Sequence, residues 1–179
     1  MTAAGVLALA VLLLAAPAPV HAGRARDLAD LDDRTSVETR QRGARGLGQS
    51  GTMDDLPALA RALRDTDSGV RAFSETSMWE IWSRSGDEEV DRLFAVGIEQ
   101  MTVREAEAAV ETFSRIIRRR PDFAEGWNKR ATLYYLLGEY ERSLADCDEV
   151  MKRNPYHFGA LSGYGMIFMR LGETETALQ

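Results

Sequence analysis

Few residues in this chain of 179 residues could carry out catalysis or bind a metal ion. Its one cysteine is Cys147, and its two histidines are His21 and His157. Because His21 lies in a segment that we expect to be removed, the remaining histidine and cysteine are too few for a structural zinc site. Cys147 falls at an inward-facing place of a predicted helix, which favours a buried thiol over a nucleophile. Since no GxSxG, HExxH or GxxxxGK[ST] motif occurs either, we expect a non-catalytic protein with no metal and no cofactor.

Clusters of charged residues occur at predicted helix ends. The pairs Asp54-Asp55 and Glu88-Glu89 fall at predicted helix starts, where the helix dipole favours carboxylates. The basic run 115–120 falls at a predicted helix C-terminus, where the dipole favours cations. A phosphate-binding patch is the weaker interpretation of that run. The formal net charge of −6 argues against a general nucleic-acid binder, which is usually basic, so we expect no nucleic-acid partner.

The first 22 residues have the composition of a secretory signal. No polar side chain occurs from Ala3 to Ala16, and the segment ends with Ala22 two positions after Val20. We expect cleavage after Ala22, which leaves 179 − 22 = 157 residues, and export to the periplasm of a bacterium without membrane insertion. The apolar run is short for a membrane span. An uncleaved membrane anchor remains the alternative, because no Lys or Arg precedes the run.

The second half of the chain contains a repeat. A shift of 34 residues superposes Pro121 on Pro155, Trp127 on Leu161, Tyr134 on Phe168 and Gly138 on Gly172. A fixed period with helical periodicity inside it is typical of stacked helix–turn–helix units. Small residues recur where the two helices of a unit would approach most closely, as the pairs Gly97 with Ala109, Ala131 with Ser143, and Gly165 with Ala177. The pattern predicts an all-α fold of antiparallel helix pairs.

Over about residues 87–179 the sequence resembles the tetratricopeptide repeat. It matches the positions at which that repeat has, in order, a tryptophan, a small residue, a tyrosine, a glycine, a second small residue and a proline. The resemblance implies that the first helix of each unit lines a concave groove that binds a peptide or protein segment. Carried over position by position, the groove residues are Asp91, Phe94, Ile98, Met101, Glu125, Asn128, Thr132, Tyr135, Gly159, Ser162, Met166 and Met169. The cations with which some members clamp a carboxylate are missing there, so we expect an apolar partner segment. Packing between units is the alternative role of the methionines.

A second pattern occupies residues 46–74, where spaced leucines precede Asp65 and, six residues later, Arg71. It resembles the short bacterial HEAT-type repeat, which implies hydrogen bonds of such a pair between neighbouring units. Asp67 is the expected N-cap of the second helix. The first half, residues 23–86, also repeats when the chain is shifted by 35 residues.

The predicted segments are a signal at 1–22, HEAT-like repeats at 23–86 and tetratricopeptide repeats at 87–179, the last one incomplete. We expect one continuous right-handed α-solenoid of about eight helices, since no Pro- or Gly-rich linker separates the halves. The two periods meet in the helix that begins near Asp87, and Trp79, just before it, is expected to pack in the core together with its neighbour Trp82.

The third tetratricopeptide unit is cut short at Gln179, which is expected to leave Ile167, Phe168 and Leu171 partly uncovered. Three functions follow as hypotheses. The first is an exported, non-catalytic module that binds a protein or peptide in its groove. The second is a structural subunit of an envelope assembly, joined or self-associated through this C-terminal face. The third and weakest is a lyase, because HEAT-like repeats also resemble those of bilin lyases.

Overall fold

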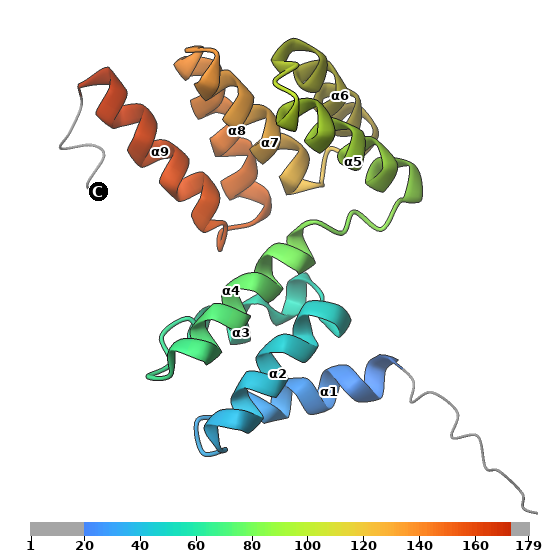
Figure 1. Cartoon of the computed structure of the whole chain (residues 1–179), viewed down its shortest axis with the longest axis vertical. Helices are drawn as coiled ribbons and strands as arrows, with labels where there is room; N and C mark the ends of the chain where they lie inside the picture. Colours follow the sequence, from blue (N-terminus) through green and yellow to red (C-terminus); the bar gives the residue numbers. More distant parts are fainter. Residues whose placement is uncertain (1–19, 173–179) are drawn as a thin grey trace, which may run out of the picture.

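The computed structural model describes residues 20–172 (Figure 1). Those residues form helices and turns and contain no β-strand. The elements are α1 (Val20–Asp30), α2 (Val37–Ser50), η1 (Met53–Asp55, a 3₁₀ turn), α3 (Leu56–Ala62), α4 (Ser68–Trp82), α5 (Glu88–Thr102), α6 (Ala106–Arg119), α7 (Ala124–Leu136), α8 (Tyr140–Arg153) and α9 (Phe158–Leu171). The predicted all-α class is therefore confirmed, with nine α-helices in this part of the chain rather than about eight.

Polar side chains cap the starts of several helices. Ser36, Asp67, Asp87 and His157 each accept a hydrogen bond from a backbone N–H in the first turn of α2, α4, α5 and α9, respectively. Such a cap satisfies a donor that has no partner inside the helix. The expected N-cap at Asp67 and the expected helix start near Asp87 are both confirmed.

Proline and glycine mark the helix ends that the repeat pattern predicts. Helices α6 and α8 stop just before Pro121 and Pro155, because proline disfavours helical backbone in the residue that precedes it. The chain leaves α7 and α9 through Gly138 and Gly172, each with φ of 78°. Glycine adopts this left-handed conformation without the steric cost that a Cβ atom brings.

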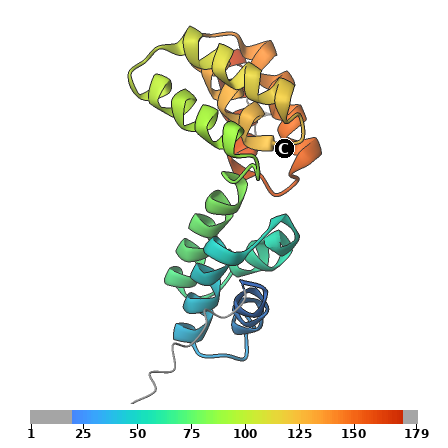
Figure 2. The same cartoon turned by 90° about the vertical axis from the view of Figure 1, so that its right-hand side faces the viewer.

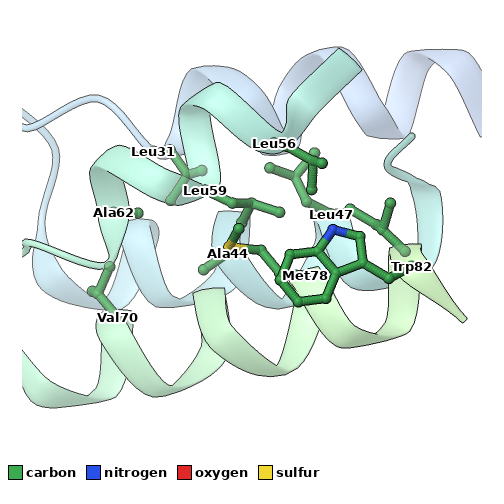
Figure 3. Packing of buried hydrophobic residues seen from close by; sticks show 10 residues of the cluster. Leu31, Ala44, Leu47, Leu56, Leu59, Ala62, Val70, Met78 and Trp82 are labelled. Atoms are coloured by element: carbon green, nitrogen blue, oxygen red, sulfur yellow. The ribbon is translucent and has the colours of Figure 1, made fainter. Parts of the chain in front are cut away.

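Helices α1–α4 enclose one hydrophobic core. Helix α2 packs along both α1 and α4, and α3 lies against α4. Figure 3 shows Leu47, Leu56 and Met78, all fully buried, meeting between α2, α3 and α4. The leucines of the HEAT-like pattern thus face inward, as the pattern predicts.

An ion pair joins α2 to the turn between α3 and α4. Nε and Nη2 of Arg40, in α2, donate to the two carboxylate oxygens of Asp65 at 2.7 and 3.1 Å. Arg71, six residues after Asp65, donates instead to the backbone carbonyls of Asp65 and Thr66. The side chain of Asp65 therefore pairs with Arg40 of α2 and not with Arg71, the residue that the resemblance implied.

Helices α5–α9 stack in chain order, each against the next. The predicted close approach of Ala131 and Ser143 is confirmed, and Gly97, predicted to pair with Ala109, lies close to Phe113 of the same helix. The Ser143 hydroxyl donates to the carbonyl of Ala131 at 2.8 Å, and a Cβ atom on Gly97 would lie 2.6 Å from Cζ of Phe113. The third predicted pair includes Ala177, which lies outside the described residues.

The two groups of helices meet at an aromatic cluster. Helices α4 and α5, although consecutive in the chain, make little contact with each other. The end of α4 lies near the start of α9 instead (Figure 1). There Trp82 stacks on His157 at a ring-centroid distance of 4.4 Å, and Trp79 meets Phe158 edge-on at 5.2 Å. In Figure 2, which is turned by 90°, helices α1–α4 lie in the lower half of the molecule and helices α5–α9 in the upper half. The expected continuous stack is therefore interrupted between α4 and α5.

The physical reason for this interruption lies in residues 83–87. Gly86 has φ of 72°, so the chain turns after α4 and α5 leaves its direction. The core role predicted for the tryptophans is confirmed, since Trp82 is only 3% exposed and Trp79 packs against the same cluster. We call Trp79, Trp82, His157 and Phe158 the junction cluster.

The N-terminal prediction falls mostly outside the described residues. Residues 1–19 of the predicted signal are not described, and α1 begins at Val20, so the predicted cleavage point lies in its first turn. Between residues 20 and 172, no helix has the length and apolar character needed to cross a bilayer.

Candidate functional site

Five of the predicted groove residues, the fifth being Gly159, line one shallow hollow between α7 and α9. Asn128, Thr132 and Tyr135 come from α7 and Met166 from α9. Ala131, Gly159 and Gly163 also line this hollow of about 50 Å³, and Ser143 and Cys147 of α8 complete it. The 34-residue register thus brings side chains from successive first helices to one surface.

We call Thr132, Tyr135, Ser162, Met166 and Met169 the α7–α9 face. Met169 is 60% exposed and Met166 is 42% exposed, whereas Tyr135 is half-buried. The Tyr135 hydroxyl accepts a hydrogen bond from Nε of Arg170 at 3.3 Å. The face therefore combines flexible apolar side chains with one aromatic ring that a hydrogen bond fixes, a combination that suits varied apolar contacts.

Side chains of helix α5 that the sequence assigns to the groove pack in part against the core. Phe94 is half-buried and meets Phe113 and Phe123 edge-on at 5.8 and 5.6 Å. Met101 packs against the same buried cluster, in line with the alternative packing role. Asp91 and Ile98 are exposed, but Asp91 accepts a hydrogen bond from the Ser85 hydroxyl at 2.6 Å. The Phe94 ring thus packs in part against an aromatic core, and its groove role stays a prediction.

Glu125 also does not face the groove, because it is fully buried. Its Oε1 lies 2.5 Å from Nε2 of His157, and its Oε2 lies 3.3 Å from Nζ of Lys129. Asn128, only 7% exposed, donates its amide to both carboxylate oxygens. We call Glu125, Asn128, Lys129 and His157 the junction network. The prediction that Glu125 contacts a ligand is therefore wrong.

The hydrogen bonds of His157 fix its tautomer. Nδ1 accepts from the backbone N–H of Ala160 at 3.1 Å, so the proton is on Nε2, which donates to Glu125. Burial alone would raise the pKa of Glu125, but the hydrogen bond from His157 and the charge of Lys129 outweigh it and hold that pKa below the ordinary value of 4.5. Glu125 is therefore ionised at neutral pH.

The roles of Glu125 and His157 were not predicted from the sequence. One signal was available: the 34-residue shift aligns His157 with Phe123, a buried residue, and a polar side chain at such a place needs a buried partner. The network links α7 to α9 directly beneath the ring of Trp82. This location indicates a structural role for the network at the junction and not a ligand-binding role.

Cys147 is buried, as predicted. Burial raises the pKa of its thiol to about 12, and the neighbouring carboxylates Asp146 and Asp148 contribute to the rise. Only the thiolate is a strong nucleophile, so this thiol has little reactivity in the folded protein.

The basic run 115–120 takes part in ion pairs at the end of α6. The partners are Glu111 for Arg118 at 2.8 Å, Asp87 and Glu89 for Arg119 at 3.0 and 2.7 Å, and Asp122 for Arg120 at 2.9 Å. The Arg119 guanidinium holds the pKa of the Asp87 carboxyl below its usual range. This arrangement supports the helix-end interpretation of the run.

Residues 46–51 have the Gly-x-Gly-x-x-Gly spacing of dinucleotide-binding loops. Here they form the end of α2 and follow no strand, and a Cβ atom on Gly48 would lie 2.7 Å from the Ser77 hydroxyl oxygen. The glycine therefore permits α2 and α4 to pack closely. From residue 20 to residue 172 no group of three His, Cys, Asp or Glu side chains is placed to hold a metal ion.

The exposed side of α9 differs from the prediction in one residue. Leu161 is 53% exposed, Leu171 is 40% exposed and Phe168 is half-buried, whereas Ile167 is fully buried. Ile167 was expected to be partly uncovered, but α9 turns it toward the interior. We call Leu161, Phe168 and Leu171 the α9 outer face.

Comparison with known proteins identifies the repeat. No family model matches the chain, and no solved structure matches it. The chain is similar to a TPR repeat-containing protein of Rhizobium etli, with 31% identity over 127 residues, which are 71% of this chain and 61% of that protein. The chain thus spans about three fifths of the length of this relative. Its consecutive helix pairs, its 34-residue period and this similarity together show that the chain is a tetratricopeptide-repeat protein.

Proposed function

We propose that the protein is an exported, non-catalytic interaction module that binds an apolar segment of a partner polypeptide at the α7–α9 face. The relationship to a tetratricopeptide-repeat protein supports an interaction role. The observation that carries the choice of site is the exposure of Met166 and Met169 beside the hollow lined by Tyr135. Exposed apolar side chains that adjoin a hollow are typical of interaction surfaces.

The size of the face suits weak to moderate binding. Burying one apolar anchor contributes about 1.5–3 kcal/mol. Two or three anchors would sustain roughly micromolar affinity once the loss of freedom on binding is subtracted. The side chains of the α7–α9 face are uncharged, although Arg170 contacts the Tyr135 hydroxyl, so the affinity is expected to depend only weakly on salt.

The combined substitution Tyr135→Ala, Met166→Ala and Met169→Ala is expected to weaken partner binding at least about tenfold, since it removes the apolar contacts. The partner is first captured from the envelope fraction with the wild-type chain, and its affinity is then measured by calorimetry. The matched control is Met53→Ala with Val96→Ala, which truncates side chains that are 44% and 49% exposed elsewhere on the surface.

Unchanged affinity in the triple variant, or a steep loss of affinity between low and high salt, would contradict this site. Weakening by Leu161→Ala with Leu171→Ala instead would favour the structural subunit, joined through the α9 outer face. The exposure of those two leucines is the observation behind that second candidate.

Export is proposed from the apolar N-terminal run, with cleavage between Ala22 and Gly23. Arg24, which follows the cleavage point, is expected to hold α1 against the fold after cleavage, because it donates to both carboxylate oxygens of the buried Asp55 at 2.7 and 2.8 Å. N-terminal sequencing of protein recovered outside the cytoplasm is expected to begin at Gly23. A chain that still begins at Met1 would favour a membrane anchor.

A further inference from the structure

One position in the repeat has an unusual backbone conformation. Residues 104, 138 and 172 are spaced 34 apart and each follows a first helix. Gly138 and Gly172 have φ of 78°, and Arg104 has φ of 65°. Among the described residues, Arg104 is the one non-glycine residue with positive φ. An L-residue with a long side chain is disfavoured there, so an arginine in place of the repeat's glycine suggests a role for its side chain.

Arg104 lines an apolar cavity of about 390 Å³. Its other walls are Met101 of α5, Ala106 of α6, and Leu133, Leu136 and Leu137 at the end of α7. Leu136 is 68% exposed and Leu137 is 39% exposed, so the apolar wall is open to solvent. We call these six residues the Arg104 pocket. Its size lies within the range of ligand-binding pockets.

The Arg104 pocket contains one charge and no acid. Arg104 is exposed, and the side chains that line the pocket with it are all apolar, so none of them pairs with its guanidinium. Several other arginines, such as Arg130, bond a carboxylate at two points. A ligand that fills this pocket would therefore offer apolar groups to the leucines and a carboxylate to the arginine.

We propose that the Arg104 pocket, separate from the α7–α9 face, binds an amphipathic helix of a partner polypeptide that presents two apolar side chains and an acidic side chain one turn further on. Side chains three or four positions apart in a helix lie about 5–6 Å from one another, so one helix face can present an apolar and an acidic side chain side by side. Laying such a face in an apolar groove is a common mode of peptide recognition.

The proposal predicts opposite effects of one substitution on stability and on binding. Arg104→Gly removes the cation but restores the residue type that the backbone favours. The variant is expected to unfold at a higher temperature than wild type and to bind the acidic helix more weakly. Because the variant would be the more stable protein, weaker binding could not result from misfolding.

The test uses three labelled alanine- and glutamine-based peptides of about 18 residues, long enough to be partly helical. The first carries two leucines four positions apart and a glutamate one turn further on; the second has glutamine in place of that glutamate. The third is a short unstructured peptide with a C-terminal leucine and a free carboxylate. Binding to the full chain is followed by fluorescence anisotropy.

Wild type is expected to bind the glutamate peptide about three- to fivefold more tightly than the glutamine peptide, as an exposed ion pair allows. In Arg104→Gly this preference should disappear, while Leu136→Ala should weaken both helical peptides. Equal binding of the two peptides by wild type, no measurable binding of either, or a preference that survives Arg104→Gly would overturn the proposal. Preferred binding of the C-terminal leucine peptide would overturn the helical partner. The triple variant of the α7–α9 face should bind all three peptides as wild type does, so a failure of one site is distinguishable from a failure of the other.

Discussion

Replacing Phe113 with alanine is expected to lower the free energy of unfolding by about 3–5 kcal/mol. The Phe113 side chain is fully buried between α5 and α6 and meets the ring of Phe94 edge-on. Its removal would leave a cavity that the surrounding helices fill only in part. Urea denaturation followed by circular dichroism measures the change, and Val96→Ala on exposed α5 surface should change stability by less than about 0.5 kcal/mol.

A second substitution tests whether Phe113 and Gly97 form one contact. Gly97→Leu alone is expected to cost about 1–3 kcal/mol, because its side chain would collide with the Phe113 ring. In the double variant the new leucine can enter the space that the ring leaves. The combined loss should therefore be smaller than the sum of the two single losses. Strict additivity would show that the two residues do not pack against each other.

Replacing Glu125 with alanine is expected to cost about 3–5 kcal/mol, the usual result of removing one partner from a buried ionic contact. The substitution leaves the Nε2 proton of His157 and the amide of Asn128 without their acceptor. An exposed glutamate provides the control: Glu99→Ala should be nearly silent. Glu125→Gln should cost less than Glu125→Ala, since the amide oxygen can still accept from His157.

Tryptophan fluorescence distinguishes loosening of the junction from global unfolding. Two of the three tryptophans, Trp79 and Trp82, belong to the junction cluster. In Glu125→Ala the fluorescence transition should therefore come at lower urea concentration than the loss of helical circular dichroism. Coincident transitions at the wild-type midpoint would contradict the role of the junction network.

Glu125 also makes the stability of the fold depend on pH. The pKa of Glu125 is lower in the folded protein than its ordinary value of 4.5, so its ionisation stabilises the fold at pH values above about 4.5. That contribution is lost as the pH falls through the folded-state pKa. Stability of wild type should decline in this acidic window, and Glu125→Gln should decline less steeply over the same range.

Local features of the fold could be predicted because their causes are local. The caps at Asp67 and Asp87, the helix ends before Pro121 and Pro155, and the burial of Cys147 follow from residue type and helical spacing. Five members of the predicted groove do share one hollow, because the repeat places them on the first helices of successive units, α7 and α9.

The predicted groove residues Phe94 and Glu125 illustrate the limit of that reasoning. Their positions in the repeat place them on first helices, but position does not reveal which neighbour covers each side chain. Phe94 packs in part against an aromatic core that includes Phe113, and Glu125 is covered by His157 from a helix 32 residues away in the sequence. Burial of this kind depends on contacts between distant segments.

The sequence by itself determined the helical class, the 34-residue period and the close-packed small residues, since each depends on spacing along one or two adjacent helices. Only the tertiary structure decided how the two repeat types meet. The turn at Gly86 separates α5 from α4, and the end of α4 gains its partners in α9, through Trp82 and His157. A periodic pattern describes which face of a helix is apolar, but it contains no information about which of several apolar faces will cover it. That choice is made by the geometry of one turn and by side chains 75 residues apart in the chain, 82 and 157.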